Sequence, residues 1–483
     1  MKQKSLKLNM LLNMIKSFTS IVFPLISFPY VSKILGVESL GAYNFSTSVI
    51  TYIALLAALG IDYYAVREGA KVRDDKEKFS EFVHQVFSIN LISTIFSYLV
   101  LGGLIIFVPK FFEYRVLLLI LGSQVLFTTL GVNWIFSIYE EYTYITVRSI
   151  IVQFVSVIAM FLFIKTEEDV WVYATITVIA SVGSNIFNFF FSRRYCNLKF
   201  TLHIDWKAHL KPILVLFGMG AAATVYANSD MIMLGFMKGE YSVGIYSVSM
   251  KIHTIIKLML SSAVLVSIPR LSMLLGQKRK DEANAVASNV YATLMTLVVP
   301  GICGLIVLSR EVVIILSDEA FGSAIYSHII LCFAMFFALG SYFWGQAVLV
   351  PSKKEHVVLK VTIWSAVVNI ILNCIFIPIF SEVAAAFTTL IAELIGFIWN
   401  YREGHKCVQI KGTLKILLKI MLGCIPIIVC SVLLKCFIES MILYTVTLIV
   451  ISALLYAVIE IVLKNEAVYE IYSSLKSKLK RQS

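Results

Sequence analysis

Apolar residues fall in runs of about twenty or more along most of this chain, and short polar segments separate the runs. A helix needs about 20 apolar residues to cross the roughly 30 Å hydrocarbon core of a bilayer. We therefore predict an all-α polytopic membrane protein with about 14 transmembrane helices. The predicted spans cover residues 10–35, 40–65, 82–108, 114–138, 144–164, 169–192, 212–236, 241–267, 286–308, 323–349, 357–378, 383–401, 414–435 and 440–463.

Composition supports this class. The chain has 483 residues, of which 59% are hydrophobic and 14% are charged, whereas a soluble domain carries about 25% charged residues. The basic N-terminal segment leads into the first span without a small-residue cleavage site, so we expect it to be retained. The eight cysteines are scattered without ligand-like spacing. We interpret them as small apolar residues and expect neither a metal site nor a cofactor.

The basic residues behind the net charge of +12 follow the predicted membrane topology. With a cytoplasmic N-terminus, about 31 of the 41 lysines and arginines fall in or beside cytoplasmic segments, and the outer loops hold about seven. Positive residues concentrate on the cytoplasmic side of membrane proteins. This bias predicts a multi-pass protein of the cytoplasmic (inner) membrane with both termini in the cytoplasm. Because topology explains the positive charge, we do not expect the protein to bind nucleic acid. The expected partner of the basic residues is the bilayer with its anionic lipid heads.

A short motif, G-x-Y-x-x-S, occurs twice, at residues 41–46 and 244–249. In both copies an arginine follows the tyrosine by 24 residues, Arg67 in the first and Arg270 in the second. The offset between the copies is 203 residues. Six spans per copy give the copies one orientation, which predicts two six-helix lobes related by an axis along the membrane normal.

A Leu-Gly pair precedes each copy, ending at Gly36 and at Gly235, with about four extra residues in the second copy. The repeat sets the predicted division of the chain. We expect an N-terminal lobe over residues 1–200 (spans 1–6), a C-terminal lobe over 201–405 (spans 7–12), spans 13–14 over 406–463 and a basic cytoplasmic tail over 464–483.

Charged groups interrupt the apolar helix predicted at residues 241–267. Lys251, His253 and Lys257 lie within the span, where a lysine costs roughly 2.5–3.5 kcal/mol. Such residues face a bundle interior or a watery cavity, so we predict a cationic site for an anionic substrate. The alternative is that the lysines pair with acids on neighbouring helices or extend toward the interface. A polar stripe of Ser242, Tyr246, Ser249, His253, Lys257 and Ser261 predicts a wet lumen.

Other spans also carry polar residues. In the first span Asn13 and Lys16 share a stripe, and Pro24 and Pro29 predict a bend that could line a cavity. Small polar residues that only pack helices are the competing interpretation. Candidates elsewhere are Asn44 and Asp62 in span 2, the latter near its inner end, Asp230 in span 7, Asn369 and Asn373 in span 11, and Glu393 in span 12. Arg148 begins span 5 at the inner interface, where we expect contact with lipid heads.

No catalytic constellation is present in the sequence. It contains no P-loop, dinucleotide-binding glycine motif, G-x-S-x-G or paired carboxylates on an outer loop. The predicted outer loops are too short for an enzyme site, so we expect a transporter and not an enzyme. A polymerase or ligase of lipid-linked sugars, the alternative from another class, would need a large catalytic outer loop.

Several stretches resemble the polysaccharide-transporter family, the Wzx-type repeat-unit flippases of capsule and O-antigen assembly within the multidrug/oligosaccharidyl-lipid/polysaccharide exporter superfamily. They are FPYVSKILGVESLGAYNFSTSVITYIALLAALGIDYYAVREGAKVRDDKEKF, YANSDMIMLGFMKGEYSVGIYSVSMKIHTIIKLMLSSAVLVSIPRLS, WGQAVLVPSKKEH, VVNIILNCIFIPIF and AAAFTTLIAELIG. One departure is Ser381-Glu382-Val383, where relatives tend to have glycines.

The resemblance implies a two-lobed bundle that opens alternately to each side of the membrane. It implies an undecaprenyl-diphosphate-linked oligosaccharide as substrate, moved from the cytoplasmic to the outer leaflet, and a polysaccharide polymerase or chain-length complex as protein partner. A flippase of peptidoglycan or teichoic-acid precursors shares this mechanism. A cation-coupled drug exporter fits less well, because such relatives typically carry an acid in the first span and residues 8–35 contain none.

These considerations assign hypothetical roles to particular residues. We expect Lys257, Lys16 and Lys251 to hold the diphosphate. Asn13, Asn44, Tyr246, Ser249, Asn369 and Asn373 would contact sugar hydroxyls. His253, Glu393, Asp62 and Asp230 are candidates for proton or ion coupling. Arg67, Arg148 and Arg270 would contact lipid heads.

Overall fold

The computed structural model describes the backbone of residues 6–410, 412–465 and 468. Side chains are described over the same ranges except at 6–18, 20, 21, 142, 413 and 414. Every regular element in this part of the chain is helical, and it contains no strand. The predicted all-α class is therefore confirmed.

The chain divides into two compact units, Met1–Gly244 and Ile245–Ser483, called here the first and second unit. The boundary falls near the start of the helix that carries the second repeat motif. The lobes that we derived from the sequence repeat, 1–200 and 201–405, stay a prediction.

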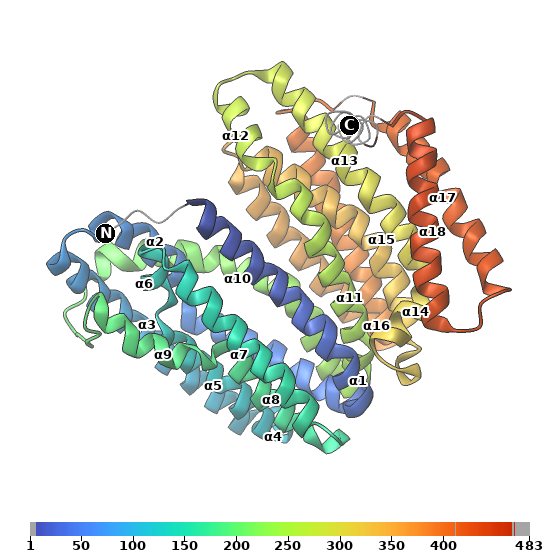
Figure 1. Cartoon of the computed structure of the whole chain (residues 1–483). Helices are drawn as coiled ribbons and strands as arrows, with labels where there is room; N and C mark the ends of the chain where they lie inside the picture. Colours follow the sequence, from blue (N-terminus) through green and yellow to red (C-terminus); the bar gives the residue numbers. More distant parts are fainter. Residues whose placement is uncertain (1–5, 411, 466–467, 469–483) are drawn as a thin grey trace. The chain divides into compact units, whose positions relative to one another are not determined.

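In the first unit, long helices run beside one another and short helices cap their ends (Figure 1). They are α1 (Leu6–Ala58), α2 (Ile61–Val72), α3 (Lys76–Phe107), α4 (Pro109–Glu113), α5 (Arg115–Gly131), α6 (Asn133–Ile138), α7 (Tyr142–Phe163), η1 (Glu167–Asp169), α8 (Val170–Val178), η2 (Ile179–Gly183), α9 (Asn185–Phe191), η3 (Ser192–Arg194) and α10 (Trp206–Lys238).

The next helix, α11 (Glu240–Leu265), begins in the first unit and continues into the second. In the second unit α17 and α18 lie next to each other at one edge of the bundle (Figure 1). The remaining elements are α12 (Ile268–Gly276), α13 (Lys280–Val307), α14 (Ser309–Leu316), η4 (Glu319–Phe321), α15 (Ala324–Tyr342), η5 (Phe343–Leu349), α16 (Glu355–His405), α17 (Thr413–Lys435) and α18 (Met441–Val462).

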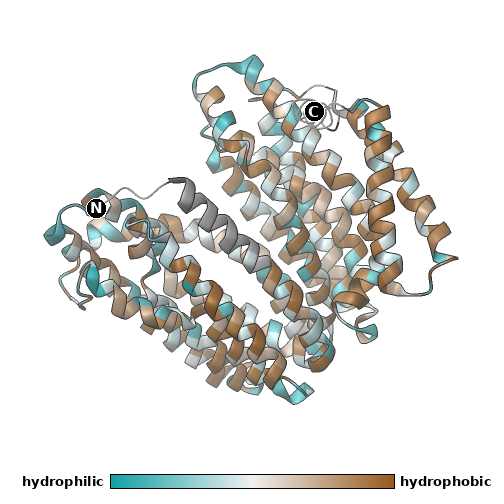
Figure 2. Cartoon of the chain, viewed as in Figure 1, coloured by the Kyte–Doolittle hydropathy of each residue, from teal (hydrophilic) through white to brown (hydrophobic). Residues whose placement is uncertain are grey.

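Within the described residues, 11 helical segments are long and apolar enough to cross a membrane, and α5 is a shorter apolar helix. Two of the long helices each contain two predicted spans. α1 is interrupted at Gly36 and α16 at Ser381, where the backbone leaves the helical conformation. The helices are apolar along most of their length and polar residues gather in the connecting segments (Figure 2). The number of fourteen spans stays a prediction.

The repeat is visible in the backbone itself. Gly36 has φ 68° and ψ −175°, and Gly239 has φ 89° and ψ −172°. Glycine adopts positive φ without a steric penalty, so both positions make the same sharp turn between two spans. They are 203 residues apart, which is the offset of the motif. The sequence paired Gly36 with Gly235, and the conformation instead pairs it with Gly239.

Aspartate side chains cap the starts of α3 and α10. The Asp75 carboxylate accepts hydrogen bonds from the backbone N–H groups of Glu77 and Lys78, both at 3.2 Å. The Asp205 carboxylate accepts one from Ala208 at 3.0 Å. These bonds satisfy amide groups that a helix start leaves unpaired. The bonds to Lys78 lower the pKa of Asp75, so α3 keeps a charged cap at neutral pH.

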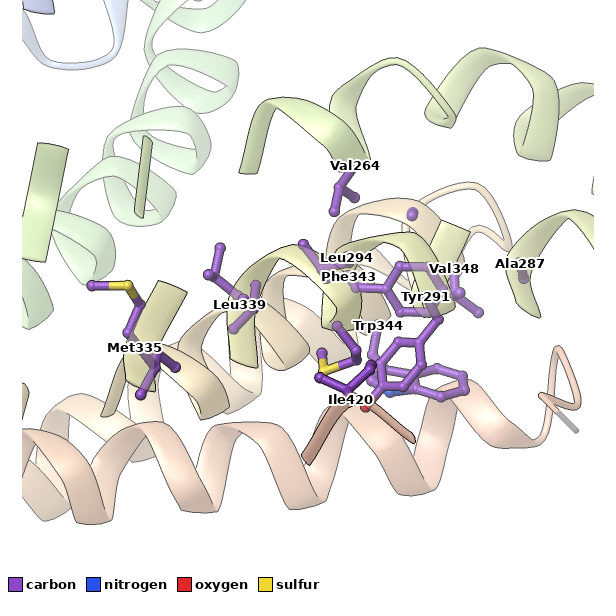
Figure 3. Close-up of a cluster of buried hydrophobic side chains, with 14 of the residues drawn as sticks. Val264, Ala287, Tyr291, Leu294, Met335, Leu339, Phe343, Trp344, Val348 and Ile420 are labelled. Carbon is purple, nitrogen blue, oxygen red and sulfur yellow. The ribbon is translucent and has the colours of Figure 1, made fainter. Parts of the chain in front are cut away.

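The largest side chains of the second unit gather in one cluster. Tyr291 from α13 packs against Phe343 and Trp344, with ring centroids 5.1 and 6.1 Å away (Figure 3). Gly404 of α16 makes room for the indole, because a Cβ there would lie 2.5 Å from it. In a membrane, close packing rather than removal of apolar surface from water holds helices together. This cluster therefore fixes α13, α15 and α16 against one another.

Candidate functional site

The polar stripe of α11 lies at helix contacts. Ser242, Tyr246, Ser249, His253 and Ser261 are all buried, and Lys257 is the partly exposed member. The sequence predicted that this stripe would face a wet lumen. In the structure most of it is buried, and Ser249 and His253 have partners on a neighbouring helix.

Two of those partnerships lie in the second unit, on α15. The Ser249 hydroxyl donates to the Ala324 carbonyl at 2.9 Å and lies 2.8 Å from the Ser327 hydroxyl. One turn further along, His253 Nδ1 lies 3.1 Å from the Leu331 carbonyl. Hydrogen bonds of this kind join helices within a membrane. A sugar contact for Ser249 and proton coupling for His253 stay predictions.

Lys257 and Glu393 form an ion pair inside the second unit. Lys257 Nζ lies 3.0 Å from Glu393 Oε1, and the two side chains are 34% and 10% exposed. Lys257 is 17 residues into α11, about 26 Å from its start. The sequence had assigned these residues to different roles, and the structure brings them together. The lysine thus has an internal anion where a phosphate was expected.

The other predicted diphosphate ligands are less defined. Lys251 lies on α11 and is partly buried. Lys16 and Asn13 lie on α1 among the residues whose side chains are outside the described part of the chain. Tyr246 is completely buried on α11. Roles of these four residues in diphosphate or sugar binding stay predictions.

Asn369 and Asn373 belong to a closed polar network within α16. Asn373 Nδ2 donates to Asn369 Oδ1 at 3.1 Å, and the Thr388 hydroxyl donates to Asn373 Oδ1 at 2.5 Å. All three side chains are buried. The network joins the two halves of the helix on either side of Ser381. Its geometry serves helix packing in this conformation, and sugar contact stays a prediction.

The candidates in the first unit belong to different helices. Asn44 donates to the Leu40 carbonyl of its own helix at 2.8 Å. Asp230 is buried on α10. Asp62 lies in the first turn of α2 and lines a small cavity of about 30 Å³ together with Asn90 and Trp134. A cavity of this size holds about one water molecule. Ion coupling at either acid stays a prediction.

The three arginines expected at lipid heads differ in environment. Arg67 on α2 and Arg270 on α12 are exposed on short amphipathic helices, at positions related by the 203-residue offset. Arg148 on α7 is partly buried, and its Cζ lies 5.1 Å from the centre of the Tyr144 ring. The first two fit an interface position, and lipid contact stays a prediction for all three.

The glycines of the repeated motif allow two backbone segments of the first unit to approach closely. An ideal Cβ at Gly41 would lie 1.9 Å from the Glu240 carbonyl oxygen, and one at Gly244 would lie 2.1 Å from that of Val37. All four residues belong to the first unit. Val37 and Glu240 are themselves 203 residues apart. The two copies therefore cross symmetrically, and each glycine admits the backbone of the other copy.

Sequence reasoning missed a buried acid in the last span. Glu460 is fully buried, and its Oε2 accepts a hydrogen bond from Asn465 Nδ2 at 2.6 Å. Tyr456 donates to the Thr296 carbonyl at 2.9 Å, which ties α18 to α13. The signal was an acid near the C-terminal end of an otherwise apolar span, since such groups seldom face lipid.

Buried charges, helix breaks and an internal repeat in a bundle of apolar helices define a multi-pass membrane protein of the transporter class. The fold is similar to that of a solved structure titled "Lipid II flippase MurJ, inward closed conformation", with a TM-score of 0.71 and 19% identity over 94% of this chain and 99% of the other. This likeness concerns the fold.

The sequence comparisons give the family. Residues 6–275 match the family described as "Polysaccharide biosynthesis protein", and the chain belongs to that family. It is 20% identical to a "Putative O-antigen transporter" of Escherichia coli (strain K12) over 81% of this chain and 94% of the relative. It is 23% identical to "Capsular polysaccharide biosynthesis protein CapF" of Staphylococcus aureus over 75% and 90%. The resemblance to the Wzx-type flippases is confirmed, and the transporter class is favoured over an enzyme.

Proposed function

We propose that this protein moves undecaprenyl-diphosphate-linked oligosaccharide repeat units from the cytoplasmic to the outer leaflet by alternating access, for capsule, O-antigen or exopolysaccharide synthesis. Family membership and the flippase-like fold support this proposal. Both termini would lie in the cytoplasm, as the distribution of basic residues predicts. A polymerase or chain-length complex would take the product on the outer face.

The observation that carries the proposal is the intramembrane cation at Lys257. A lipid diphosphate cannot cross the bilayer core unaided, because its charges would lose their water. A lysine within the span replaces part of that water with a fixed charge. Its side chain is one-third exposed while Glu393 is nearly buried, so the ammonium group is the accessible member of the pair.

Glu393 gives Lys257 a counter-charge when no substrate is bound. A cation inside a membrane is costly unless it is paired, and Glu393 at 3.0 Å provides the pairing. The diphosphate would then compete with the carboxylate for the ammonium group. Substrate binding would break an internal ion pair and release Glu393. Loss of this pair would couple substrate binding to a change of conformation.

The test is transbilayer movement of a fluorescent undecaprenyl-diphosphate oligosaccharide in proteoliposomes. Movement by the native protein and its loss in Lys257→Ala would support the proposal. Arg310→Ala is a matched control, because it breaks an exposed ion pair of the same unit, Arg310 with Glu319 at 3.2 Å. Wild-type rates in both Lys257→Ala and Lys16→Ala, at normal expression, would refute the cationic site.

Two further arms separate the alternatives. Glu393→Gln removes the competing carboxylate, so it should bind the diphosphate more tightly than the native protein does. A lipid-linked peptidoglycan or teichoic-acid precursor replaces the oligosaccharide in the second arm, and faster movement of that precursor would reassign the substrate. Proton coupling through His253 and Glu393 is a separate hypothesis, which a rate insensitive to an imposed pH gradient would exclude.

A further inference from the structure

Arg148 is a partly buried cation that contacts Tyr144 but has no acidic partner among the residues that the structure describes. It lies on α7, six residues after the helix begins at Tyr142, about 9 Å along its axis. Its guanidinium Cζ lies 5.1 Å from the centre of the Tyr144 ring. Nε and Nη1 are buried, and neither has a hydrogen-bond partner among the residues that the structure describes. Burying charged donors without partners is costly.

The elements packed against α7 supply no counter-anion. They are α1, α6, α8 and η2. The sequences of α6, α8 and η2 contain no Asp or Glu, and the single acid of α1, Glu38, follows the break at Gly36. The segment 6–21 contains no acid either, although most of its side chains lie outside the described part of the chain.

The acids closest to Arg148 along the chain are engaged elsewhere. Glu140 lies 3.6 Å from Arg73 in an exposed ion pair. Glu141 accepts a hydrogen bond from the Tyr195 hydroxyl. Arginine stays protonated in proteins, so its charge cannot be removed by titration. The two acids nearest to Arg148 in the sequence therefore have other partners in the structure.

We propose that Arg148 anchors a second anion site, in the first unit, whose ligand is a phosphate ester of a lipid. A guanidinium matches two phosphate oxygens through a pair of parallel N–H groups. Val147 and Ile151, beside Arg148 on α7, are 49% and 57% exposed. A lipid bound beside them would place its phosphate near Arg148 while its chains remain in the bilayer, and the buried Nε and Nη1 would have to turn outward to meet it. The diphosphate of the substrate and the phosphate of an anionic phospholipid share this chemistry, and only the first source rests on the proposed function.

The test uses the full chain purified in phosphate-free maltoside micelles, with bound lipid counted by native mass spectrometry. The probes are undecaprenyl diphosphate, phosphatidylglycerol and inorganic pyrophosphate. Arg148→Gln should weaken binding of at least one probe about ten- to hundredfold, because charge-assisted hydrogen bonds are lost. Arg148→Lys should retain part of it. Arg193→Gln is the matched control, since Arg193 also lies over an aromatic ring, Phe190 at 5.6 Å, but is exposed.

The outcomes separate the two sources. Loss confined to undecaprenyl diphosphate assigns the site to substrate, and loss confined to phosphatidylglycerol assigns it to a structural lipid. Equal affinity of the native protein and Arg148→Gln for all three probes would overturn the proposal. So would a large drop in the melting temperature of Arg148→Gln without lipid, because it would reveal an internal partner. Failure of the flipping assay with this binding intact would refute the proposed function alone.

Discussion

The crossing of the two repeat motifs predicts a strong and specific effect of a single methyl group. An ideal Cβ at Gly41 lies 1.9 Å from the Glu240 carbonyl oxygen, and real Cβ contacts under 3.0 Å essentially never occur. Gly41→Ala must therefore push the two backbones apart by at least 1.1 Å, the difference between these two distances. Such overpacking costs about 1–3 kcal/mol, and the higher helix propensity of alanine returns up to about 1 kcal/mol.

The measurement is the melting temperature of the purified protein in detergent. Gly102→Ala is the matched control, because Gly102 is also helical and a Cβ there meets nothing within 4 Å. This control should melt at the native temperature or slightly above it, whereas Gly41→Ala should melt several degrees lower. Gly244→Ala should behave like Gly41→Ala, since its Cβ would lie 2.1 Å from the Val37 carbonyl oxygen.

Combining the two substitutions sharpens the test. Once the first methyl group has separated the backbones, the second meets less resistance. The double variant should therefore lose less stability than the sum of the single losses, because the two substitutions act on the same contact and their effects are coupled. The reasoning fails if Gly41→Ala melts at or above Gly102→Ala, because the close approach of the two copies would then not exist in the protein.

Two further predictions concern the backbone and the cysteines. Ser381→Gly should raise the melting temperature, because Ser381 has φ 52° and glycine removes a strain of about 1 kcal/mol. Ser288→Gly, within the regular helix α13, should lower it. Equal changes of melting temperature in the two variants would contradict this account. Single-cysteine variants treated with a membrane-impermeant maleimide on intact cells should react at Cys436, exposed between α17 and α18, if that connection is external. Cys196 should resist labelling at pH 8 even after solubilisation, because burial raises its thiol pKa to about 12 and leaves about one thiolate in ten thousand. For Cys436, labelling only in permeabilised cells would show that the predicted topology is inverted.

The repeat could be found from the sequence, but its contacts could not. Its 203-residue offset identifies two copies that share a glycine, a tyrosine and a distant arginine. The sequence could not show that Gly41 packs against the backbone of Glu240 and Gly244 against that of Val37, since these contacts depend on how the helices cross. It also paired Gly36 with Gly235, the glycine of the second Leu-Gly pair. The positive φ of Gly239 corrects this, and only coordinates contain that angle.

The candidate site shows the same division. Sequence alone found Lys257 and Glu393, because a charge within an apolar run is conspicuous wherever its partner lies. It assigned them separate roles, since 136 residues separate them along the chain and no local pattern reports a distance of 3.0 Å. Sugar contact of Asn369 and Asn373 stays a prediction, and sequence alone could not show that these residues hydrogen-bond each other and Thr388.

The sequence by itself determined the class of the protein: long apolar runs require helices that span a membrane, and the bias of basic residues sets their predicted direction. These properties depend on composition and periodicity, which are local. Tertiary structure decided which buried polar groups are satisfied and which are not. Ser249 and Lys257 have partners within the second unit, whereas Arg148 keeps buried donors for which the described residues offer none. A helix pattern gives the face on which a side chain lies, but only packing shows what that face meets.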